Sequence, residues 1–478
     1  MSDWMSKDKV HEECGVIGLI GPAGENVSKD LYFGLVALQH RGQESAGISV
    51  SDTDGPKGNI ETVKGMGLVS EVFQEDDLNR LRGNIGVGHV RYSTTGESSL
   101  KNAQPIAMNY IKGSLALVHN GNIMNASALK EEQMYRGQAH YSSSDSEVLA
   151  YEIISQRIHT DSIEQAVLAA AAKLKGGYAI IVMSPRKLIA MRDPFGIRPL
   201  VLGKREDTYI LASESAAIQS VGAKFIRDIL PGEIVTVTMG GIQSNKAFCQ
   251  KQAAHCVFEY IYFARTDSVM DGISVRDARF RAGQALAERD AEREALTPGQ
   301  TGGSSKGSRV DLVAGVPDSG LIAAEGYSFS SGIPYASVFH KNSYIGRSFI
   351  KPTDRERRDA VHMKLSVLPS VVCGKRILLI DDSIVRGTTM REIIKALKKA
   401  GAREVHVRIS SPPFLYPCYY GTDVPTARQL IAADHSTEDI RKKIGADSLA
   451  YLQIEDFRKM TGELPLCTAC FDGKYPVS

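Results

Sequence analysis

The stretch RILLIDDSIVRGTT, residues 376–389, decides the fold of the second half of the chain. Its opening apolar run suits a central strand of a parallel sheet, which is buried on both faces. Three apolar residues follow at the spacing of one helix face: Ile393, Leu397 and Ala400. Gly401 is placed to end that helix. The order strand, loop, helix predicts a βαβ unit, whose loop lies where open α/β sheets bind ligands.

The loop itself, residues 381–389, carries two aspartates, small residues and hydroxyls. A helix N-terminus offers free backbone N–H groups and a favourable dipole, so this composition suits a phosphate. Asp381 and Asp382 are suited to hold ribose hydroxyls or a magnesium ion through their oxygens. A polar loop of any doubly wound fold is the alternative interpretation of a lone DD or GTT.

The complete string resembles the signature of phosphoribosyltransferases that bind phosphoribosyl pyrophosphate (PRPP). The resemblance implies that Asp381 and Asp382 contact the ribose and its magnesium ion. It also implies a cradle for the 5′-phosphate, made by Ser383, Arg386, Gly387, Thr388 and Thr389.

Two upstream segments extend this resemblance. GVPDSG, residues 315–320, is similar to the loop that meets the pyrophosphate, which implies PRPP contacts at Asp318 and Ser319 and a magnesium contact at Ser319. KNSYIGRSFIKPTDRERRDAVHMKLS, residues 341–366, is similar to the mobile loop that closes over the substrate, beginning with Lys341. A solvated basic face is the alternative interpretation of any single basic residue in that loop.

The first half of the chain has a different pattern of predicted secondary structure. Short β-type runs, separated by Gly, Asn and Ser turns, lie at 15–20, 83–90, 115–120, 178–183 and 233–239. With a helical stretch at 144–158, they predict an α+β domain with antiparallel sheets. After residue 258 the chain alternates helical and buried strand patterns, at 275–296, 310–316, 333–339 and 376–380. That alternation predicts an α/β domain with a parallel sheet.

Polar motifs punctuate the first half after Cys14. They are LQHRGQESAGI at 38–48, GHVRYSTTG at 88–96, LVHNGNI at 117–123 and SSSDSEV at 142–148. Each is weak alone, since an NG pair most often marks a hairpin and an isolated Arg91 or Asp145 is most often a surface charge. Together and in this order they resemble the glutaminase domain of N-terminal-nucleophile amidotransferases, with stacked antiparallel sheets between helices.

That resemblance implies roles for five residues. Cys14 would attack the amide carbon of glutamine, and Asn120 with the Gly121 N–H would form the oxyanion hole. Arg91 would hold the α-carboxylate of glutamine and Asp145 its α-amino group. The pairings are chemically apt, because a guanidinium matches a carboxylate bidentately and fixed donors stabilise a developing oxyanion.

The two halves in this order resemble the glutamine PRPP amidotransferase family, from Cys14 to about Pro476. The resemblance implies a glutaminase domain at 14–250 and a phosphoribosyltransferase domain at 257–478. Ammonia from the first site would displace pyrophosphate at the ribose C1, giving 5-phosphoribosylamine, glutamate and pyrophosphate, the first step of de novo purine (IMP) biosynthesis. It further implies magnesium as a cofactor, feedback inhibition by purine nucleotides and a homotetramer.

Two departures from the family pattern stand out. The Gly/Ser/Pro-rich segment TPGQTGGSSKGS, residues 297–308, is longer than the expected connection and has nothing to bury. Ser343 stands where the pattern has arginine, which affects one expected phosphate contact.

Two other functions compete with this interpretation. A different amidotransferase with the same first domain, such as glucosamine-phosphate synthase, would not need the DDSIVRGTT loop. A regulator that only senses a ligand would not need Cys14, Arg91, Asn120 and Asp145 together. One assay distinguishes the PRPP amidotransferase from these two alternatives. Only the PRPP amidotransferase should release glutamate from glutamine much faster when PRPP is present.

The composition narrows the setting. A formal net charge of +2 over 478 residues shows no electrostatic footprint for nucleic acid or an anionic membrane. No apolar run approaches the roughly 20 residues of a spanning helix, and the first 13 residues lack the apolar centre of a secretory signal. We therefore expect a cytoplasmic protein, in which the seven cysteines do not form disulfides.

Four of the cysteines form a candidate ligand set. Cys467 and Cys470 lie in CTACF at CxxC spacing, and Cys256 and Cys418 supply two more thiolates. Zinc sites made of four cysteines usually show two such pairs, so a lone CxxC favours zinc or no metal. All four positions match the iron–sulfur branch of the family, which implies a structural 4Fe–4S cluster held by the C-terminal segment. Cys249 and Cys373 match no ligand position.

The resemblance to N-terminal-nucleophile glutaminases, together with the position of Cys14, predicts that residues 1–13 are a leader that is removed. A cysteine thiol has a reference pKa near 8.5 and needs a base, and the motifs offer no assignable catalytic histidine. The freed α-amino group, with a reference pKa of about 7.7–8.0, can serve as this base. The amide nitrogen of an uncleaved chain cannot, because its lone pair is delocalised into the peptide bond. A frayed terminus is the alternative interpretation of the polar leader. N-terminal sequencing of active enzyme should show Cys14 first, and full glutaminase activity from the uncleaved chain would contradict the prediction.

Overall fold

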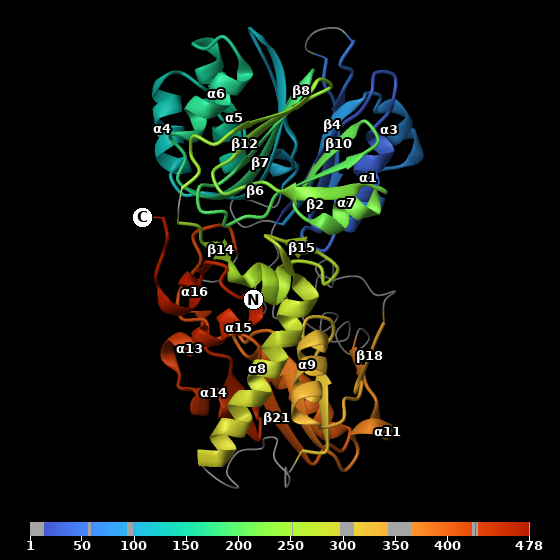
Figure 1. The fold of residues 1–478 in the computed structure, drawn as a ribbon, viewed down its shortest axis with the longest axis vertical. Helices are drawn as coiled ribbons and strands as arrows, with labels where there is room; N and C mark the ends of the chain where they lie inside the picture. Colours follow the sequence, from blue (N-terminus) through green and yellow to red (C-terminus); the bar gives the residue numbers. More distant parts are fainter. Residues whose placement is uncertain are drawn as a thin grey trace.

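The computed structural model describes residues 14–55, 59–92, 99–250, 252–296, 310–342, 365–422, 426 and 429–477. The predicted leader, the 297–308 insertion, Ser343 and most of the 341–366 loop lie outside the described residues. The chain folds into two parts that lie end to end along the long axis, the first drawn from blue to green and the second from yellow to red (Figure 1).

The first part contains two antiparallel sheets. One has the strand order β11-β9-β10-β1-β4-β2-β3 and the other β13-β12-β8-β7-β6-β5. The strands of the first sheet are β1 (Gly15–Ile20), β2 (Ser45–Ser51), β3 (Glu61–Met66), β4 (Ile85–Arg91), β9 (Val201–Arg205), β10 (Thr208–Ala212) and β11 (Lys224–Asp228). Those of the second are β5 (Ile106–Tyr110), β6 (Gly113–Ile123), β7 (Gly176–Ser184), β8 (Lys187–Arg192), β12 (Ile234–Thr238) and β13 (Gly241–Asn245).

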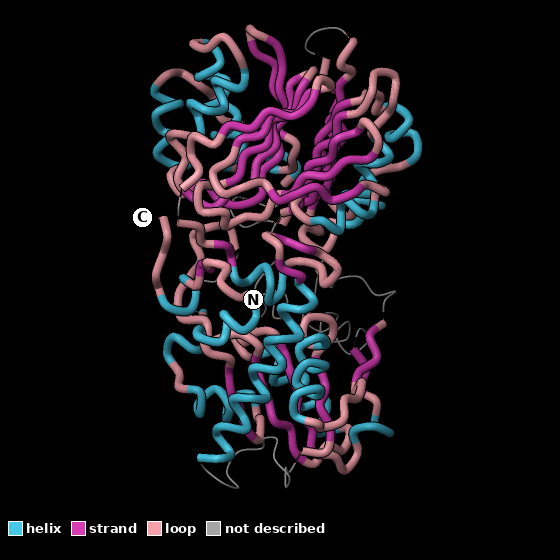
Figure 2. The backbone as a smooth tube through the Cα atoms, in the orientation of Figure 1, coloured by secondary structure: helices cyan, strands magenta, loops and turns pink. Residues whose placement is uncertain are grey.

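The two sheets pack face to face between layers of helices (Figure 2). Strand β1 is apolar throughout because both of its faces are buried. Val16 and Ile20 face the core between the sheets, whereas Ile17 and Leu19 face the outer core. The outer face of the first sheet is covered by α1 (Ser28–Ala37) and α7 (Ser215–Ser220), with α2 (Val69–Val72) and α3 (Glu75–Arg80) nearby. The second is covered by α4 (Ala126–Tyr135), α5 (Asp145–Ile158) and α6 (Ile163–Ala171).

The second part is built on a parallel sheet of order β17-β20-β21-β22. Its strands are β17 (Leu312–Gly315), β20 (Arg376–Asp381), β21 (Glu404–Ile409) and β22 (Ser448–Tyr451). Helices α8 (Val275–Leu296) and α9 (Leu321–Ser331) cover one face, and α12 (Thr388–Lys399) and α14 (Thr437–Ile444) cover the other. In β20, Leu378 and Ile380 face the first pair of helices and Ile377 and Leu379 the second, which explains the unbroken apolar run.

The prediction of a strand at 333–339 is wrong over most of its length. Only Tyr335 bridges to Val313, and strand β18 (Phe339–Lys341) pairs instead with β19 (Leu365–Val367) in a separate two-stranded sheet. Pro334 has no N–H to donate, which limits sheet pairing there to a single bridge.

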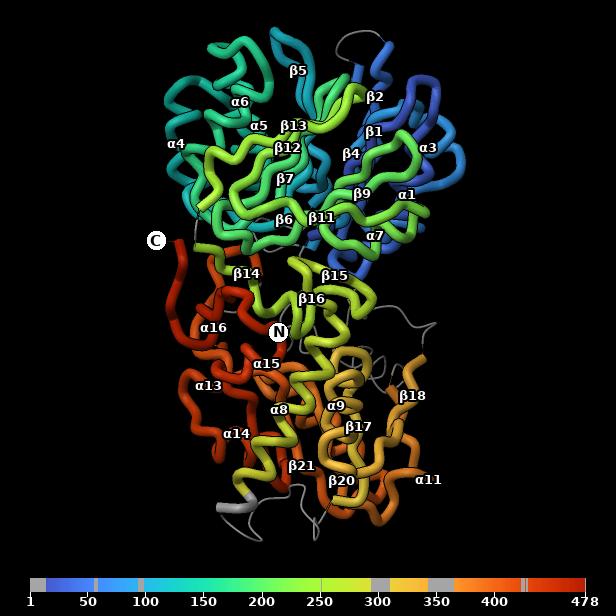
Figure 3. The backbone as a smooth tube through the Cα atoms, in the orientation of Figure 1, coloured from blue at the N-terminus to red at the C-terminus, as the bar shows by residue number. Residues whose placement is uncertain are grey.

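The end of the chain returns to the junction between the two parts (Figure 3). Strand β23 (Leu466–Cys467) pairs in parallel with β14 (His255–Cys256), which follows directly on the first part. Between β14 and α8 the chain forms the π-helical turn η2 (Glu259–Phe263) and the hairpin of β15 (Val269–Met270) and β16 (Ile273–Ser274). The other helices that the structure describes in this part are α11 (Pro369–Val372), α13 (Ile431–Asp434), α15 (Phe457–Thr461), α16 (Ala469–Asp472) and the short 3₁₀ helix η5 (Ile454–Asp456). Among the described helices, none combines the length and hydropathy that crossing a membrane requires.

Candidate active sites

Cys14 lies at the start of β1, between charged side chains of neighbouring strands. Gly15 pairs with Val90, which places the thiol beside Arg91 at the end of β4. Arg91 in turn donates a 3.2 Å hydrogen bond to Glu44. Burial raises the pKa of the Cys14 thiol to about 11, although its hydrogen bond to the Tyr92 carbonyl and the charge of Arg91 lower it. The thiol is therefore neutral at physiological pH and needs a base.

The three histidines of the neighbouring motifs have other partners. His40 bonds Glu214 at 2.7 Å, and His119 lies 3.2 Å from the Ser146 hydroxyl through Nδ1. His89 donates Nε2–H to the His119 carbonyl at 3.1 Å, and burial lowers its pKa to about 3. Among the contacts of the described residues, none of these rings reaches the Cys14 thiol.

Asn120 and Gly121 lie inside strand β6, so the alternative interpretation of this NG pair as a hairpin turn is wrong. They pair with Ala179 and Tyr178 of β7. The Asn120 side chain is fully buried, and neither its oxygen nor its nitrogen has a hydrogen-bond partner within the described part of the chain. A buried polar group without a partner costs about 1–3 kcal/mol, so this amide points to a ligand.

Gly121 has a conformation that only glycine adopts readily, with φ at +131°. A Cβ atom there would lie 2.1 Å from the carbonyl oxygen of Gly177 on β7. Position 121 therefore requires glycine, because the neighbouring strand β7 leaves no room for a side chain there.

Asp145, the first residue of α5, is a buried carboxylate held in its charged form. It accepts the Ile123 backbone N–H at 3.0 Å and lies 3.6 Å from the His119 ring. Burial alone would raise the pKa of Asp145, but His119 and the N–H groups of Ile123 and Ser146 outweigh it and lower the pKa. The charges of Asp145, Arg91 and Glu44 all act on the Cys14 thiol, so these side chains surround one site.

In the second part, the two predicted PRPP loops meet at Asp382. The hydroxyls of Ser319 and Ser383 both donate to its carboxylate, and the Asp382 N–H donates to Asp381 at 2.9 Å. Asp381 and Asp382 are almost completely buried at the carboxyl end of β20. A Cβ on Gly320 would lie 2.3 Å from the Ile380 carbonyl, so the close approach of the two loops requires glycine there.

The predicted ligands of the 5′-phosphate lie at the start of α12, whereas Asp318 precedes α9 and Lys341 lies in β18. Gly387 precedes this helix with φ at +81°, and Thr388 and Thr389 are its first residues. Arg386 donates to Gln429, and Lys341 pairs with Asp318. A cavity of about 370 Å³ lies beside this loop, lined by Arg386, Gly387, Thr388, Arg391 and residues of the 429–444 segment.

The four candidate cluster cysteines are neighbours in space. Cys256 and Cys467 lie opposite each other where β14 pairs with β23. Burial raises the pKa of Cys256 and of Cys467 to about 12 and raises that of Cys470 well above its usual value, and the mutual proximity of the thiols adds to the rise. Within the described ranges, no group of three or more Cys, His, Asp or Glu side chains has the arrangement of a preformed metal site.

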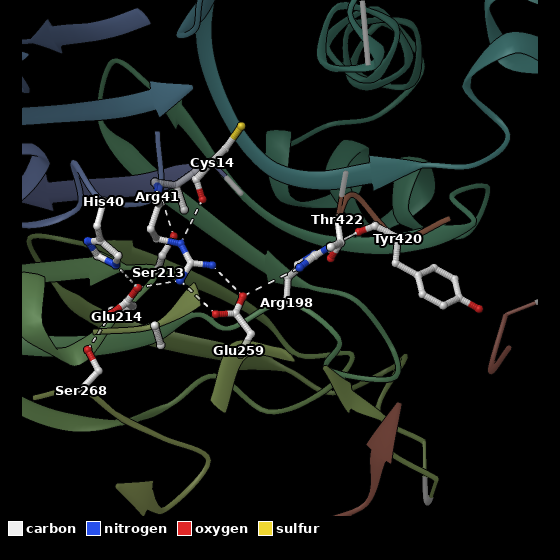
Figure 4. Close-up of polar contacts among 12 residues, drawn as sticks. Cys14, His40, Arg41, Arg198, Ser213, Glu214, Glu259, Ser268, Tyr420 and Thr422 are labelled. Carbon is white, nitrogen blue, oxygen red and sulfur yellow. Dashed lines mark hydrogen bonds and ion pairs between the residues drawn. The ribbon is translucent and has the colours of Figure 1, made fainter. Parts of the chain in front are cut away.

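The sequence analysis missed a buried ionic network behind Cys14 (Figure 4). The Arg41 guanidinium is fully buried and donates to the Cys14 carbonyl at 3.2 Å, to Glu214 at 2.6 Å and to Glu259 at 2.6 Å. His40 and Arg41 hold the pKa of Glu214 well below its usual range, although burial alone would raise it. Arg41 lies in the quoted motif at 38–48, but its partners are 173 and 218 residues away, so no local pattern identifies them.

Two domain families match the chain, a glutamine amidotransferase domain at residues 89–220 and a phosphoribosyl transferase domain at 303–410. The amidophosphoribosyltransferase of Synechococcus elongatus is 46% identical over 477 residues and covers 98% of this chain and 92% of that protein. That of Methanocaldococcus jannaschii is 43% identical over 478 residues and covers 97% of each. The chain belongs to the amidophosphoribosyltransferase family.

Structural comparison agrees with this family assignment. A solved structure of glutamine PRPP amidotransferase from B. subtilis, complexed with ADP and GMP, is 42% identical. It superposes with a TM-score of 0.86 over 97% of this chain and 98% of that chain. The predicted fold class, family and enzymatic activity, glutamine-dependent amidotransfer to PRPP in purine biosynthesis, are confirmed. The alternatives of a sugar-phosphate amidotransferase and a ligand-sensing regulator are wrong.

Asp382→Asn and Asp381→Asn should each raise the KM for PRPP. Hydrogen bonds to charged groups contribute about 1.5–3 kcal/mol, which corresponds to a rise of about 10- to 100-fold. Steady-state kinetics with ammonia as nitrogen donor measures this without the glutaminase site. Asp207→Asn, at an exposed carboxylate of the first part, is the matched control and should leave the KM unchanged. An unchanged KM in both loop variants would contradict their assignment to PRPP.

Proposed function

We propose that glutamine is hydrolysed at Cys14, with the oxyanion of the tetrahedral intermediate held by Asn120 and the Gly121 N–H. The observation that carries the proposal is the fully buried Asn120 amide, which has no partner within the described part of the chain. Arg91 binds the α-carboxylate of glutamine and Asp145 its α-amino group, and the lowered pKa of Asp145 supports the second role. Both charges act on the Cys14 thiol.

The base in this proposal is the α-amino group of Cys14 itself, freed when residues 1–13 are removed. It takes the thiol proton, the sulfur attacks the amide carbon, and the same group returns the proton to the departing nitrogen as ammonia leaves. Water then hydrolyses the thioester to glutamate. The raised thiol pKa and the engaged histidines support a base on Cys14.

The second reaction takes place at the loops around Asp382. Asp381 and Asp382 hold the ribose hydroxyls, Asp318, Ser319 and Lys341 meet the pyrophosphate, and the 5′-phosphate lies on Ser383, Arg386, Gly387, Thr388 and Thr389. Adjacent buried carboxylates with a serine hydroxyl are a donor set that fits magnesium, with Asp381, Asp382 and Ser319 as its contacts. When bound, magnesium supplies positive charge that stabilises the leaving pyrophosphate.

The C-terminal segment is proposed to hold a 4Fe–4S cluster through Cys256, Cys418, Cys467 and Cys470. Four neighbouring, partly buried thiols are the soft donor set that such a cluster requires. The cluster would tie the end of the chain to β14 at the junction between the two parts.

The domain limits, assembly and regulation complete the proposal. Residues 14–250 form the glutaminase domain and 257–478 the phosphoribosyltransferase domain. Purine nucleotides are proposed as feedback inhibitors, which the ADP and GMP bound to the B. subtilis relative support. The homotetramer and the cytoplasmic location stay predictions from the sequence.

Cys14→Ala should abolish glutamine-dependent synthesis while synthesis from added ammonia continues, because the phosphoribosyl site does not use the thiol. Loss of the nucleophile should lower the glutamine-dependent rate by at least about 10⁴-fold. Pyrophosphate release with glutamine or with an ammonium salt measures both rates. Cys373→Ala, at an exposed cysteine, is the matched control. Loss of both activities in a folded Cys14→Ala protein would contradict the division into two sites.

Anaerobically purified protein should contain about four iron and four sulfide per chain, as a 4Fe–4S cluster requires. Cys470→Ser should lose them, whereas Cys249→Ser, at a thiol outside the proposed set, should keep them. Metal and sulfide analysis with absorption spectra measures this. Stoichiometric zinc, or neither iron nor sulfide, would contradict the cluster.

A further inference from the structure

A segment of the phosphoribosyltransferase half packs against the proposed oxyanion strand of the glutaminase half. Gly421 is buried there with φ at +106°. A Cβ atom added to it would lie 2.8 Å from the carbonyl carbon and 2.9 Å from the Cα of Gly121. Real Cβ atoms do not approach backbone this closely, so Gly421 can contact Gly121 only because Gly421 has no side chain.

Hydrogen bonds hold the segment on either side of Gly421. The Asn122 side chain, which follows Gly121 on β6, donates to the Tyr419 carbonyl at 2.9 Å. The buried Arg198 guanidinium donates to the Tyr420 carbonyl at 3.0 and 2.5 Å and to the Thr422 hydroxyl at 3.2 Å (Figure 4). The backbone on both sides of Gly421 is therefore anchored to the glutaminase half.

The anchoring side chains are themselves fixed. Asp193 accepts the backbone N–H groups of Ile197 and Arg198 at 3.0 Å each, which sets the turn that carries Arg198. On β7, Gly177 lies opposite Asn122, and a Cβ there would lie 3.0 Å from the Cβ of Tyr420. Tyr420 is buried, and its hydroxyl exchanges hydrogen bonds with the backbone of Val477 near the end of the chain.

We propose that Gly421 is a positioning residue for glutamine hydrolysis, with the anchored segment 419–422 setting the backbone of Gly121 from the second half of the protein. The inference rests on the proposed function, which assigns the Gly121 N–H to the oxyanion hole. Strand β7 holds Gly121 on one side through the ladder pair with Tyr178, and segment 419–422 packs against the Gly121 backbone at Gly421. An oxyanion donor acts only when it points at the transition-state oxygen, so a small shift of Gly121 lowers the rate.

The test is Gly421→Ala, assayed in the full-length processed enzyme with saturating PRPP and magnesium. The methyl group displaces Gly121, so kcat for glutamine hydrolysis should fall by about 10- to 100-fold. The KM for glutamine should hold, because Arg91 and Asp145 bind the substrate and the oxyanion contact acts in the transition state. Ammonia-dependent synthesis in the same preparation should match wild type, which shows that the protein is folded.

Two further variants sharpen the test. Gly462→Ala is the matched control, because Gly462 also has a positive φ, at +67°, but a Cβ there meets no atom within 4 Å. It should leave both activities unchanged. Asn122→Ala, which removes the hydrogen bond to Tyr419 without adding atoms, should lower kcat in the same direction but less.

Different variants test the positioning role of Gly421 and the oxyanion role of Asn120 and Gly121 on which it rests. Wild-type glutaminase kinetics in Gly421→Ala, a change confined to the KM for glutamine, or an equal fall in ammonia-dependent synthesis would each overturn the positioning role. Wild-type kcat in Asn120→Ala would instead overturn the oxyanion assignment, and the inference with it. Loss of glutaminase in Asn120→Ala with no effect of Gly421→Ala would leave the proposed function standing and overturn the inference alone.

Discussion

A guanidinium removed from water must be paired, and the junction of this protein is organised around that requirement at Arg41. Burying an ion costs several kcal/mol unless partners compensate. Glu214 and Glu259 supply two carboxylates, and the Cys14 carbonyl accepts a further hydrogen bond. Because Glu259 begins the turn η2 that leads into the second part, the Arg41 side chain bonds both the Cys14 backbone and the start of the second part.

The same network reaches the second active site through α8. Glu259 begins the turn η2, and the buried Arg279 of α8 donates to the carbonyls of Tyr260 within this turn and of Ala264 directly after it. Burial lowers the pKa of Arg279 to about 10, and the charge of Asp382 opposes that effect. Buried charges therefore run from the Cys14 backbone to the carboxylate where the PRPP loops meet. This arrangement joins two reactions that have to be coordinated in one chain.

Local sequence patterns predicted the individual elements well where one physical demand acts on neighbouring residues. The apolar runs of β1 and β20 reflect burial of both strand faces, and the helix after Gly387 follows its 3.6-residue period. The prediction failed at 333–339, where an apolar run contains a proline that cannot donate to a sheet. The predicted β-type run ended at Asn120, whereas β6 continues through Gly121 to Ile123, because an NG pair alone favours a turn.

The sequence by itself determined the family and the reaction, because the chemistry of glutamine and of PRPP demands particular groups in recognisable local motifs. Only the tertiary structure decided which groups meet across the chain. It paired Arg41 with Glu214 and Glu259, left the Asn120 amide buried without a partner in the described residues, and set Gly421 against Gly121. These contacts join residues far apart in sequence, and their need for burial, charge pairing or an absent side chain exists only once the halves have packed.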